Sequence, residues 1–258
     1  MKIKLSEPFF DNAENKILKK CIDTKWISSS GPLTKIFEKK IANYLKTKHV
    51  LGIINCTSAL QLSIKLLKPN YQDEIIVPSI TFVATINSII YNNCNPIFVD
   101  CDSKFLMDTK KVLKFLKEKT ITKNGKCFNK KTKKRIIGLI LVHTFGNLVN
   151  LNTSFIKECK KRNIKIIEDS AESLGSFYIN RLGKKHSGTV GDLGCLSFNG
   201  NKIITSGGGG AIVFKNLQLF KTLPAIFLSF IKVSSFLFSG AVIIALSKQF
   251  RAGSFSST

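Results

Sequence analysis

Short apolar runs alternate along this chain with segments in which apolar residues recur at helical spacing. The segment from Pro32 to Thr47 is of the second kind, because Phe37, Ile41 and Leu45 share one helical face while lysines occupy the other. The same spacing predicts helices at 58–67, 83–91, 109–118 and 152–162, and the apolar runs predict strands at 74–77, 96–99, 136–142, 164–167, 194–198 and 211–214.

This alternation predicts an α/β fold in which a mostly parallel sheet is covered by helices on both faces. The 258 residues are enough for one substantial domain with a single core. No internal repeat is visible in the sequence. The charged segment 119–135 interrupts the alternation, and we expect it to be an exposed excursion from the domain.

Two carboxylates, Glu168 and Asp169, follow directly after the predicted strand 164–167. In open α/β sheets, ligands bind outside the carboxyl ends of the strands. A carboxylate at such an end can keep the ring nitrogen of a cofactor protonated, which a pyridoxal ring requires. The alternative is an ordinary helix N-cap with solvated acids.

A second polar stretch, Asn55-Cys56-Thr57-Ser58, follows the apolar run 50–54 and opens a predicted helix. Hydroxyls and free backbone N–H groups at a helix N-terminus form a site suited to a phosphate. The alternative here is a plain N-cap without a ligand.

A single lysine, Lys202, lies among small and polar residues between Ser197 and Gly210. A lysine in such surroundings can form a Schiff base with an aldehyde cofactor if its amine is partly deprotonated. The glycines at 207–210 would let the backbone approach a ring or a phosphate closely. A surface hairpin with a solvated lysine is the alternative.

Together with a fourth stretch, Val77-Pro78-Ser79-Ile80-Thr81-Phe82-Val83-Ala84-Thr85, these motifs resemble in order and spacing the sugar aminotransferases of the DegT/DnrJ/EryC1/StrS family. The resemblance begins near Trp26 and runs to about Phe214. It implies the large domain of a fold-type I aminotransferase that depends on pyridoxal 5'-phosphate (PLP), with a mostly parallel, mixed sheet between two helical layers. We assign residues 1–221 to this domain.

A narrower resemblance joins the insert 123–132 with the stretches 168–176 and 197–202. These segments are similar to a subgroup that aminates the 4-keto carbon of UDP-linked 6-deoxy-4-keto-N-acetylhexosamine in bacillosamine- or legionaminic-acid-type pathways for surface glycans. The resemblance implies a nucleotide-sugar substrate, glutamate as amino donor, and a homodimer for the full-length family member.

Position by position, the resemblance implies that Lys202 forms the Schiff base with PLP and then shuttles the proton. Asp169 would pair with the pyridinium nitrogen, and Glu172 would lie near the 3-oxygen of the ring. Phe82 would stack on the ring face, although the residues alone leave a core aromatic as the alternative. Relatives that act as dehydratases lack this lysine, so Lys202 favours transamination.

The phosphate of the cofactor would be bound by Thr57, Ser58 and Ser197 through hydroxyls and backbone N–H groups. The family usually has glycine where this chain has Cys56. If that position required a positive φ, the side chain would cost about 1 kcal/mol or more.

After Lys221 the resemblance ends, and residues 222–258 form an apolar tail unlike the family. A smaller C-terminal domain is expected there in family members. We expect a frameshift or truncated reading frame to have replaced it, so turnover by this chain would be weak or absent. The span from Leu223 to Ser247 also has the length of a membrane segment, although it contains Lys232. The alternative is therefore a non-catalytic product, a membrane-associated or misfolding remnant.

The formal net charge is +24, from 40 Lys and Arg against 16 Asp and Glu. Such a charge raises nucleic acid as a partner. The lysines are spread along predicted helix faces rather than forming a stripe, which favours a protein that does not bind nucleic acid. The positive field would still attract an anionic sugar nucleotide.

The 7 cysteines are scattered, odd in number and without C-x-x-C spacing, so the sequence indicates neither a disulfide framework nor a metal site. The first residues lack an apolar signal core, and we expect a cytoplasmic protein. His143 ends an apolar run and is expected to be a satisfied core or loop histidine, with a place in the cofactor pocket as the alternative.

Overall fold

A computed structural model describes residues 7–9, 12–25, 31–180 and 183–223. The chain divides into two units, Met1–Lys215 and Asn216–Thr258. The elements of the first unit are helices α1 (Asn12–Asp23), α2 (Pro32–Leu45), α3 (Cys56–Leu66), α4 (Val83–Ile90), α5 (Thr109–Lys119) and α6 (Thr153–Lys161), a 3-10 turn at Thr144–Gly146, and strands β1 (His49–Ile53), β2 (Glu74–Pro78), β3 (Asn95–Val99), β4 (Thr120–Lys123), β5 (Lys126–Asn129), β6 (Arg135–Val142), β7 (Lys165–Asp169), β8 (Phe177–Asn180), β9 (Gly183–His186), β10 (Leu193–Ser197) and β11 (Gly210–Phe214).

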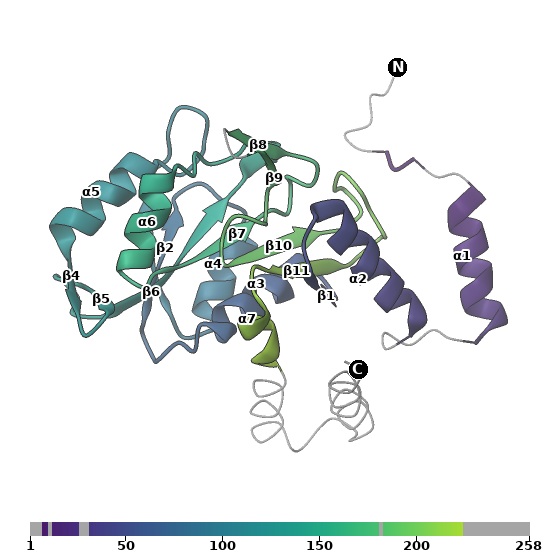
Figure 1. The fold of residues 1–258 in the computed structure, drawn as a ribbon, viewed down its shortest axis with the longest axis horizontal. Coiled ribbons are helices and arrows are strands. Elements are labelled where there is room, and N and C mark those ends of the chain that lie inside the picture. The colour runs from purple at the N-terminus through teal and green to yellow at the C-terminus, as the bar shows by residue number, and fades with distance from the viewer. Residues whose placement is uncertain (1–6, 10–11, 26–30, 181–182, 224–258) are drawn as a thin grey trace. The chain divides into compact units, whose positions relative to one another are not determined.

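The main sheet has the strand order β1-β11-β10-β7-β6-β2-β3 (Figure 1). Strands β3, β2, β6, β7 and β10 pair in parallel, whereas β11 runs antiparallel between β1 and β10. The predicted mostly parallel, mixed sheet is therefore confirmed. The central strands are buried on both faces, since all five residues of β2, β10 and β11 are buried.

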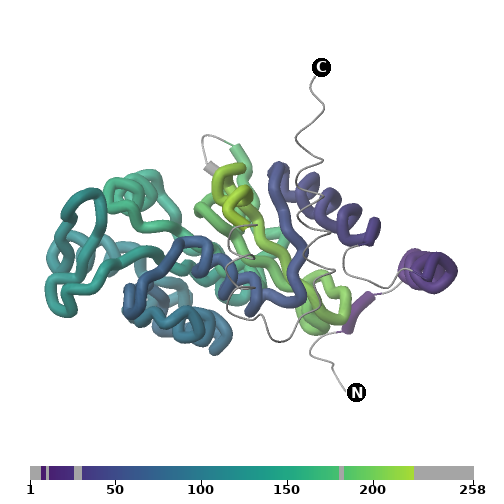
Figure 2. The backbone as a smooth tube through the Cα atoms, turned by 90° about the horizontal axis from the view of Figure 1, so that it is seen from below, coloured from purple at the N-terminus to yellow at the C-terminus, as the bar shows by residue number. Residues whose placement is uncertain are grey.

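Helices cover both faces of this sheet, as predicted. In Figure 1, α5 and α6 lie in front of the sheet, and α3 and α4 lie behind it. Val112 of α5 and Phe155 of α6 belong to one core cluster with Leu139 and Leu141 of β6. Figure 2 shows the same layering from below. A second cluster joins Leu45 of α2 to strands β1, β10 and β11. The result is the three-layer arrangement expected from the alternating pattern.

The segment 119–135 differs from the expectation of an exposed excursion. It forms an antiparallel hairpin of β4 and β5, and β5 also pairs with the start of β6. Asn124 and Gly125 form its turn, both with positive φ. Cys127 is buried, and the buried Asn129 donates from Nδ2 to Oε2 of Glu74 at 3.0 Å. The tip is exposed, but one face of the hairpin belongs to the domain.

Helix α1 and the β8–β9 hairpin were not expected from the apolar pattern. The helix buries none of its residues, so no core face guided the prediction. The hairpin is short, and its two strands pair only with each other among the described residues.

The second unit is described only from Asn216 to Leu223 and contains helix α7 (Leu217–Lys221), capped by the Asn216 side chain. Within the described ranges no helix is long and apolar enough to cross a membrane. The apolar tail beyond Leu223 lies outside the described residues, and so do the two hypotheses for it, a frameshift product and a membrane segment. Residues 26–30 lie outside them as well.

Candidate active site

The predicted site residues all lie at one edge of the sheet, beyond the carboxyl ends of its parallel strands. Strand β7 ends at Asp169 and β10 ends at Ser197. Helices α3 and α4 begin shortly after β1 and β2, at the same edge. Because parallel strands all point the same way, their ends bring segments far apart in sequence to one place.

Asp169 is the buried carboxylate of this edge, with only 6% of its surface exposed. Its Oδ2 accepts a hydrogen bond from Oγ1 of Thr85 at 2.7 Å, and its Oδ1 accepts one from the Ala171 amide at 3.2 Å. Burial raises the pKa of Asp169 above its ordinary value, while Thr85, Ala171, His143 and Lys202 act in the opposite direction. A cation next to this carboxylate would offset its burial.

Lys202 lies in the loop that joins β10 to β11. The base of the loop is closed by two bonds: the Phe198 amide donates to the Gly209 carbonyl, and the Ser206 amide donates to the Phe198 carbonyl, both at 3.0 Å. The lysine side chain is only 19% exposed, and its Nζ lies 3.1 Å from Oε1 of Glu172. The hairpin of the alternative interpretation is therefore present, but its lysine is paired rather than freely solvated.

Glu172 bridges Lys202 to a strained turn. Its Oε2 accepts a hydrogen bond from the Phe145 amide at 2.9 Å, and Phe145 has a φ of 55°, which is uncommon for a residue with a side chain. Partial burial raises the pKa of Glu172, but the bonds from Phe145 and Lys202 outweigh it and hold the pKa below its ordinary value. The carboxylate thus remains charged beside the lysine.

Phe82 is the N-cap residue of α4 and is 77% exposed. The alternative of a core aromatic is therefore wrong, because a core ring would be withdrawn from water. Thr85 lies three residues further along the same helix and contacts Asp169. One helix start therefore carries both an exposed aromatic ring and a hydrogen bond to the buried carboxylate.

The start of α3 combines both interpretations of the Asn55–Ser58 stretch. Asn55 is a true N-cap, because its side-chain oxygen accepts from the Ser58 amide at 2.8 Å. Thr57 and Ser58 are half-buried at this helix N-terminus. Cys56 is the first helical residue and is not among those with positive φ, so the strain cost considered from sequence does not arise.

Strand β11 lies between Ser197 and the start of α3. Ser197 pairs with Gly210, whose backbone touches the backbone of Asn55 so closely that an added Cβ would lie 2.5 Å from the Asn55 carbonyl carbon. Ser197 itself is 7% exposed. The three residues predicted to bind a phosphate are thus brought together by a contact that only glycine permits.

Glu168 belongs to a different environment from Asp169. It is fully buried and accepts hydrogen bonds from three backbone amides, those of Gly188, Val190 and Gly191, at 2.6 to 3.1 Å. His143 Nε2 lies 3.0 Å from its Oε2, while His143 Nδ1 accepts from the Val149 amide. The expectation of a satisfied core histidine is confirmed.

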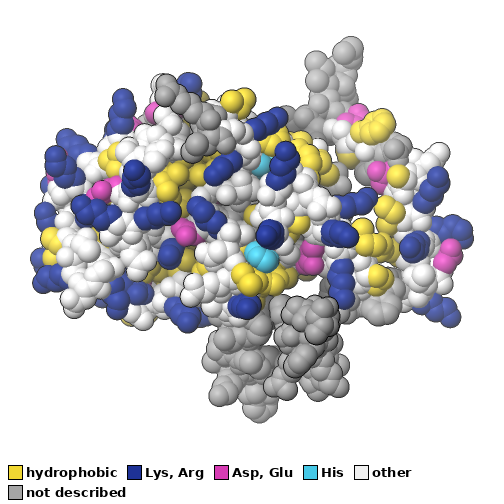
Figure 3. Space-filling model, in the orientation of Figure 1, with side chains coloured by type: hydrophobic (Ala, Val, Ile, Leu, Met, Phe, Trp, Pro, Cys, Tyr) yellow, Lys and Arg dark blue, Asp and Glu magenta, His cyan; other side chains and the backbone are white. Residues whose placement is uncertain are grey.

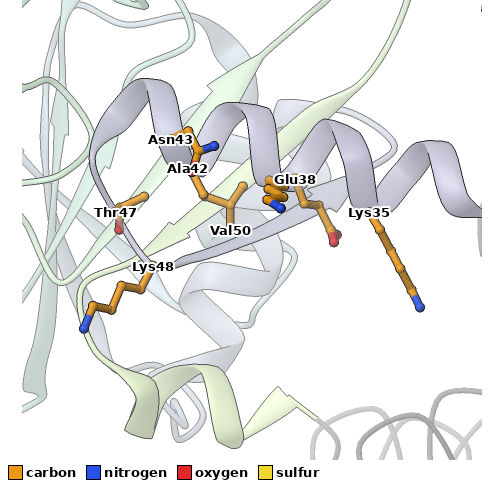
Figure 4. A pocket seen from close by; sticks show the side chains of 8 residues that line it. Lys35, Glu38, Ala42, Asn43, Thr47, Lys48 and Val50 are labelled. Carbon is orange, nitrogen blue, oxygen red and sulfur yellow. The ribbon is translucent and has the colours of Figure 1, made fainter. Parts of the chain in front are cut away.

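Two residues of this edge, Thr85 and Phe145, were not singled out from the sequence. Thr85 ends the Val77–Thr85 stretch, and its spacing of three from Phe82 on a predicted helix was the available signal. Phe145 owes its place to a backbone turn that the sequence pattern does not reveal. A separate hollow of about 460 Å³ opens between α2 and β1 and is lined by none of the seven predicted residues (Figure 4).

The DegT/DnrJ/EryC1/StrS aminotransferase family model matches residues 8–230. The chain is 36% identical over 82% of its length to the GDP-perosamine synthase of Caulobacter vibrioides. It is 33% identical, again over 82%, to the putative pyridoxal phosphate-dependent aminotransferase EpsN of Bacillus subtilis.

Solved structures give the same result for the fold. The aminotransferase TlmJ from Streptoalloteichus hindustanus superposes with a TM-score of 0.71 at 26% identity, over 87% of this chain and 57% of that one. Helicobacter pylori PseC, an aminotransferase involved in the biosynthesis of pseudaminic acid, gives 0.72 at 26% identity, over 86% and 54%. The chain spans about half the length of the curated relatives it matches, 52% and 51% for the two given above.

Proposed function

The chain belongs to the DegT/DnrJ/EryC1/StrS aminotransferase family, and on that premise we propose that it binds PLP and serves the transamination of a nucleotide-linked 4-keto-6-deoxy sugar. The observation that carries the proposal is the gathering of a paired lysine, a buried carboxylate and an exposed aromatic ring at the ligand-binding edge of the sheet. Each is the group that one part of the cofactor needs.

The residues present fit this cofactor. When bound, PLP supplies an electron sink for the bonds to the amino-bearing carbon. Asp169 would hold the ring nitrogen, because its buried carboxylate is stabilised by a cation. Phe82 would cover the ring face. Lys202 would bind the aldehyde carbon through Nζ and exchange its ion pair with Glu172 for that bond.

The phosphate would lie at the start of α3. Thr57, Ser58 and Ser197 would bind it, with Ser58 acting through its hydroxyl because its amide already donates to Asn55. The dipole of α3 favours an anion at this end.

For the substrate, we propose a UDP-linked 4-keto-6-deoxy-N-acetylhexosamine with glutamate as amino donor, in surface-glycan biosynthesis. The resemblance of the insert 123–132 supports the UDP-linked form. Three of the relatives, from Caulobacter vibrioides, Vibrio cholerae and Escherichia coli O157:H7, are named GDP-perosamine synthase, which makes a GDP-linked sugar the competing candidate. The net charge of +24 would attract either anionic nucleotide.

We further propose a cytoplasmic enzyme that forms a homodimer at full length. Its seven cysteines are free thiols, which suits a reducing compartment.

The test is the visible spectrum of the purified chain with PLP, before and after borohydride. Wild type should show a Schiff-base band that borohydride traps on Lys202, and Lys202→Ala should lack it. Lys123→Ala, at the exposed tip of the β4–β5 hairpin, is the matched control and should behave as wild type. Identical spectra for wild type and Lys202→Ala would favour a non-catalytic remnant instead.

Bleaching of the band by glutamate would then justify adding the sugars. A return of the band with the UDP-linked keto sugar, but not with the GDP-linked one, supports the proposed substrate. The reverse preference would transfer the assignment to a GDP-linked sugar.

A further inference from the structure

Two threonine hydroxyls form a chain that ends on the buried carboxylate of Asp169. Oγ1 of Thr81 donates to Oγ1 of Thr85 at 2.8 Å, and Oγ1 of Thr85 donates to Oδ2 of Asp169 at 2.7 Å. A hydroxyl has a single proton. Because Thr85 gives its proton to the carboxylate, it can only accept from Thr81, and the direction of the chain is fixed.

The first residues of α4 make this arrangement rigid. Thr81 comes directly before the N-cap residue Phe82, outside the helix, and its hydroxyl reaches Thr85 in the first turn of α4. Thr85 is fully buried, and its carbonyl accepts a hydrogen bond from Oγ of the buried Ser88 at 2.7 Å. Phe82 lies between the two threonines, so the ring contact and the bond to Asp169 share one backbone segment.

We propose that Thr85 is a positioning residue, which directs Asp169 toward the cofactor's ring nitrogen, and that Thr81 orients the Thr85 proton. This inference rests on the proposed function, since it gives the Asp169 carboxylate a ring nitrogen to face. Thr85 and Thr81 thereby have a role although neither is expected to touch the cofactor.

The surroundings of Asp169 explain why it needs such support. Burial raises the pKa of Asp169, and the Thr85 hydroxyl is the first of the groups that lower it, followed by the Ala171 amide, His143 and Lys202. The thiols of Cys56 and Cys195 also face Asp169, and burial raises their own pKa values, so both stay neutral. Removing the Thr85 hydroxyl therefore raises the pKa of Asp169 further.

The consequence for pH follows from this sign. A carboxyl group with a higher pKa takes up its proton at a higher pH as the solution is acidified. A protonated Asp169 no longer offers a charge to a pyridinium nitrogen. As the pH is lowered, a variant that lacks the Thr85 hydroxyl should therefore lose cofactor affinity at a higher pH than wild type does.

The experiment measures the PLP dissociation constant from mildly acidic to mildly basic pH for wild type, Thr85→Val, Thr85→Ser and Thr81→Val. Thr85→Val keeps the shape of the side chain but removes the hydroxyl. We expect its acid limb to move to higher pH and its affinity at mildly acidic pH to fall about ten-fold or more, the value of a hydrogen bond to a charged group. Thr85→Ser should restore the wild-type curve, and Thr81→Val should give a smaller shift in the same direction.

Ser88→Ala is the structural control. Ser88 is buried on the same helix and bonds to Thr85 through the backbone. It should lower stability without moving the acid limb. In the cofactor-free chain, carbon NMR titration of the Asp169 carboxyl should show a higher pKa in Thr85→Val and an unchanged one in Ser88→Ala.

Two results overturn the inference, and they differ. If wild type binds PLP and Thr85→Val gives a superimposable pH curve, or one that Ser88→Ala reproduces, the positioning role of Thr85 is wrong while the proposed function stands. If folded wild type binds no PLP although the Asp169 titration still moves in Thr85→Val, the proposed function fails, and the role toward a cofactor fails with it.

Discussion

Glu168 and Asp169 are neighbours in sequence, but their side chains point to opposite faces of the sheet. Side chains alternate along a strand, so Asp169 meets Thr85 of α4 while Glu168 meets His143 and the loop 188–191. The same alternation gives them opposite electrostatics. Asp169 is held by few donors and has a raised pKa, whereas Glu168 is held by many and has a lowered one.

This contrast predicts a stability effect at Glu168. Burial alone would raise the pKa of Glu168, but the bonds from His143, Gly191 and Gly188 hold it below the ordinary value of 4.5. Glu168→Gln would leave buried amide donors poorly paired, so we expect the free energy of unfolding to fall by about 3 kcal/mol near neutral pH. Urea denaturation measures the loss.

The sign of the pH dependence follows from the lowered pKa. A carboxyl group whose folded pKa is depressed stabilises the fold above its unfolded pKa, and this stability is lost as the pH falls through the folded value. The difference between wild type and Glu168→Gln should therefore shrink as the pH falls below 4.5. Glu158→Gln, which breaks a partly exposed ion pair with Arg162, should cost only about 0.5 kcal/mol. Equal losses in the two variants would contradict this account.

At the scale of elements, the β4–β5 hairpin shows how a local turn builds an unexpected part of the sheet. Asn-Gly is the strongest short signal for a two-residue hairpin turn, and Asn124-Gly125 supplies it between two short strands. The two strands are hard to recognise from the sequence, because each has only four residues and contains a lysine, so the apolar pattern is weak. The hairpin then docks through Asn129 and Glu74.

The turn itself can be tested with one methyl group. Gly125 has a φ of +68°, and nothing lies within 4 Å of an added Cβ. Gly125→Ala should therefore lower the free energy of unfolding by about 1 kcal/mol through backbone conformation alone. Gly208→Ala is the matched control, since that glycine also has open space but no positive φ, and it should cost little. The two variants are compared by thermal unfolding, and a larger loss at Gly208 would refute the explanation.

At the scale of the whole molecule, the charge is the dominant property. Lys and Arg side chains lie over most of the face shown in Figure 3 rather than in one stripe, as expected from the sequence. The ion pairs of the described residues, such as Lys111 with Asp100 and Arg162 with Glu158, use only a few of the 40 basic groups. A net charge of +24 means that like charges repel one another in the folded state.

Salt should therefore stabilise the chain. Between about 10 mM and about 1 M salt the Debye length falls from about 30 Å to about 3 Å. We expect the unfolding midpoint to rise by about 2–4 °C, which corresponds to ~1 kcal/mol for a chain of this size. Differential scanning calorimetry across this range measures it, with an uncharged osmolyte as the control for general solute effects. A midpoint that falls with salt would mean that attractive pairs outweigh the repulsion.

The sequence by itself determined the alternation of helices and strands, and with it the layered sheet and the edge at which Asp169, Lys202 and the α3 helix start gather. These follow from hydrophobic periodicity and from the rule that parallel strands end at one edge. Local patterns of a few residues were sufficient, because each element buries its own apolar face.

Only the tertiary structure decided which partner each polar group has. The pairing of Lys202 with Glu172, the Thr85 hydroxyl on Asp169 and the capture of Glu168 by His143 join residues 25 to 84 positions apart. Such contacts depend on strand order and on the face to which each side chain points, neither of which is encoded in the spacing of a single segment. The close approach of Gly210 to Asn55 is of the same kind, since the sequence shows a glycine but not the backbone that it meets.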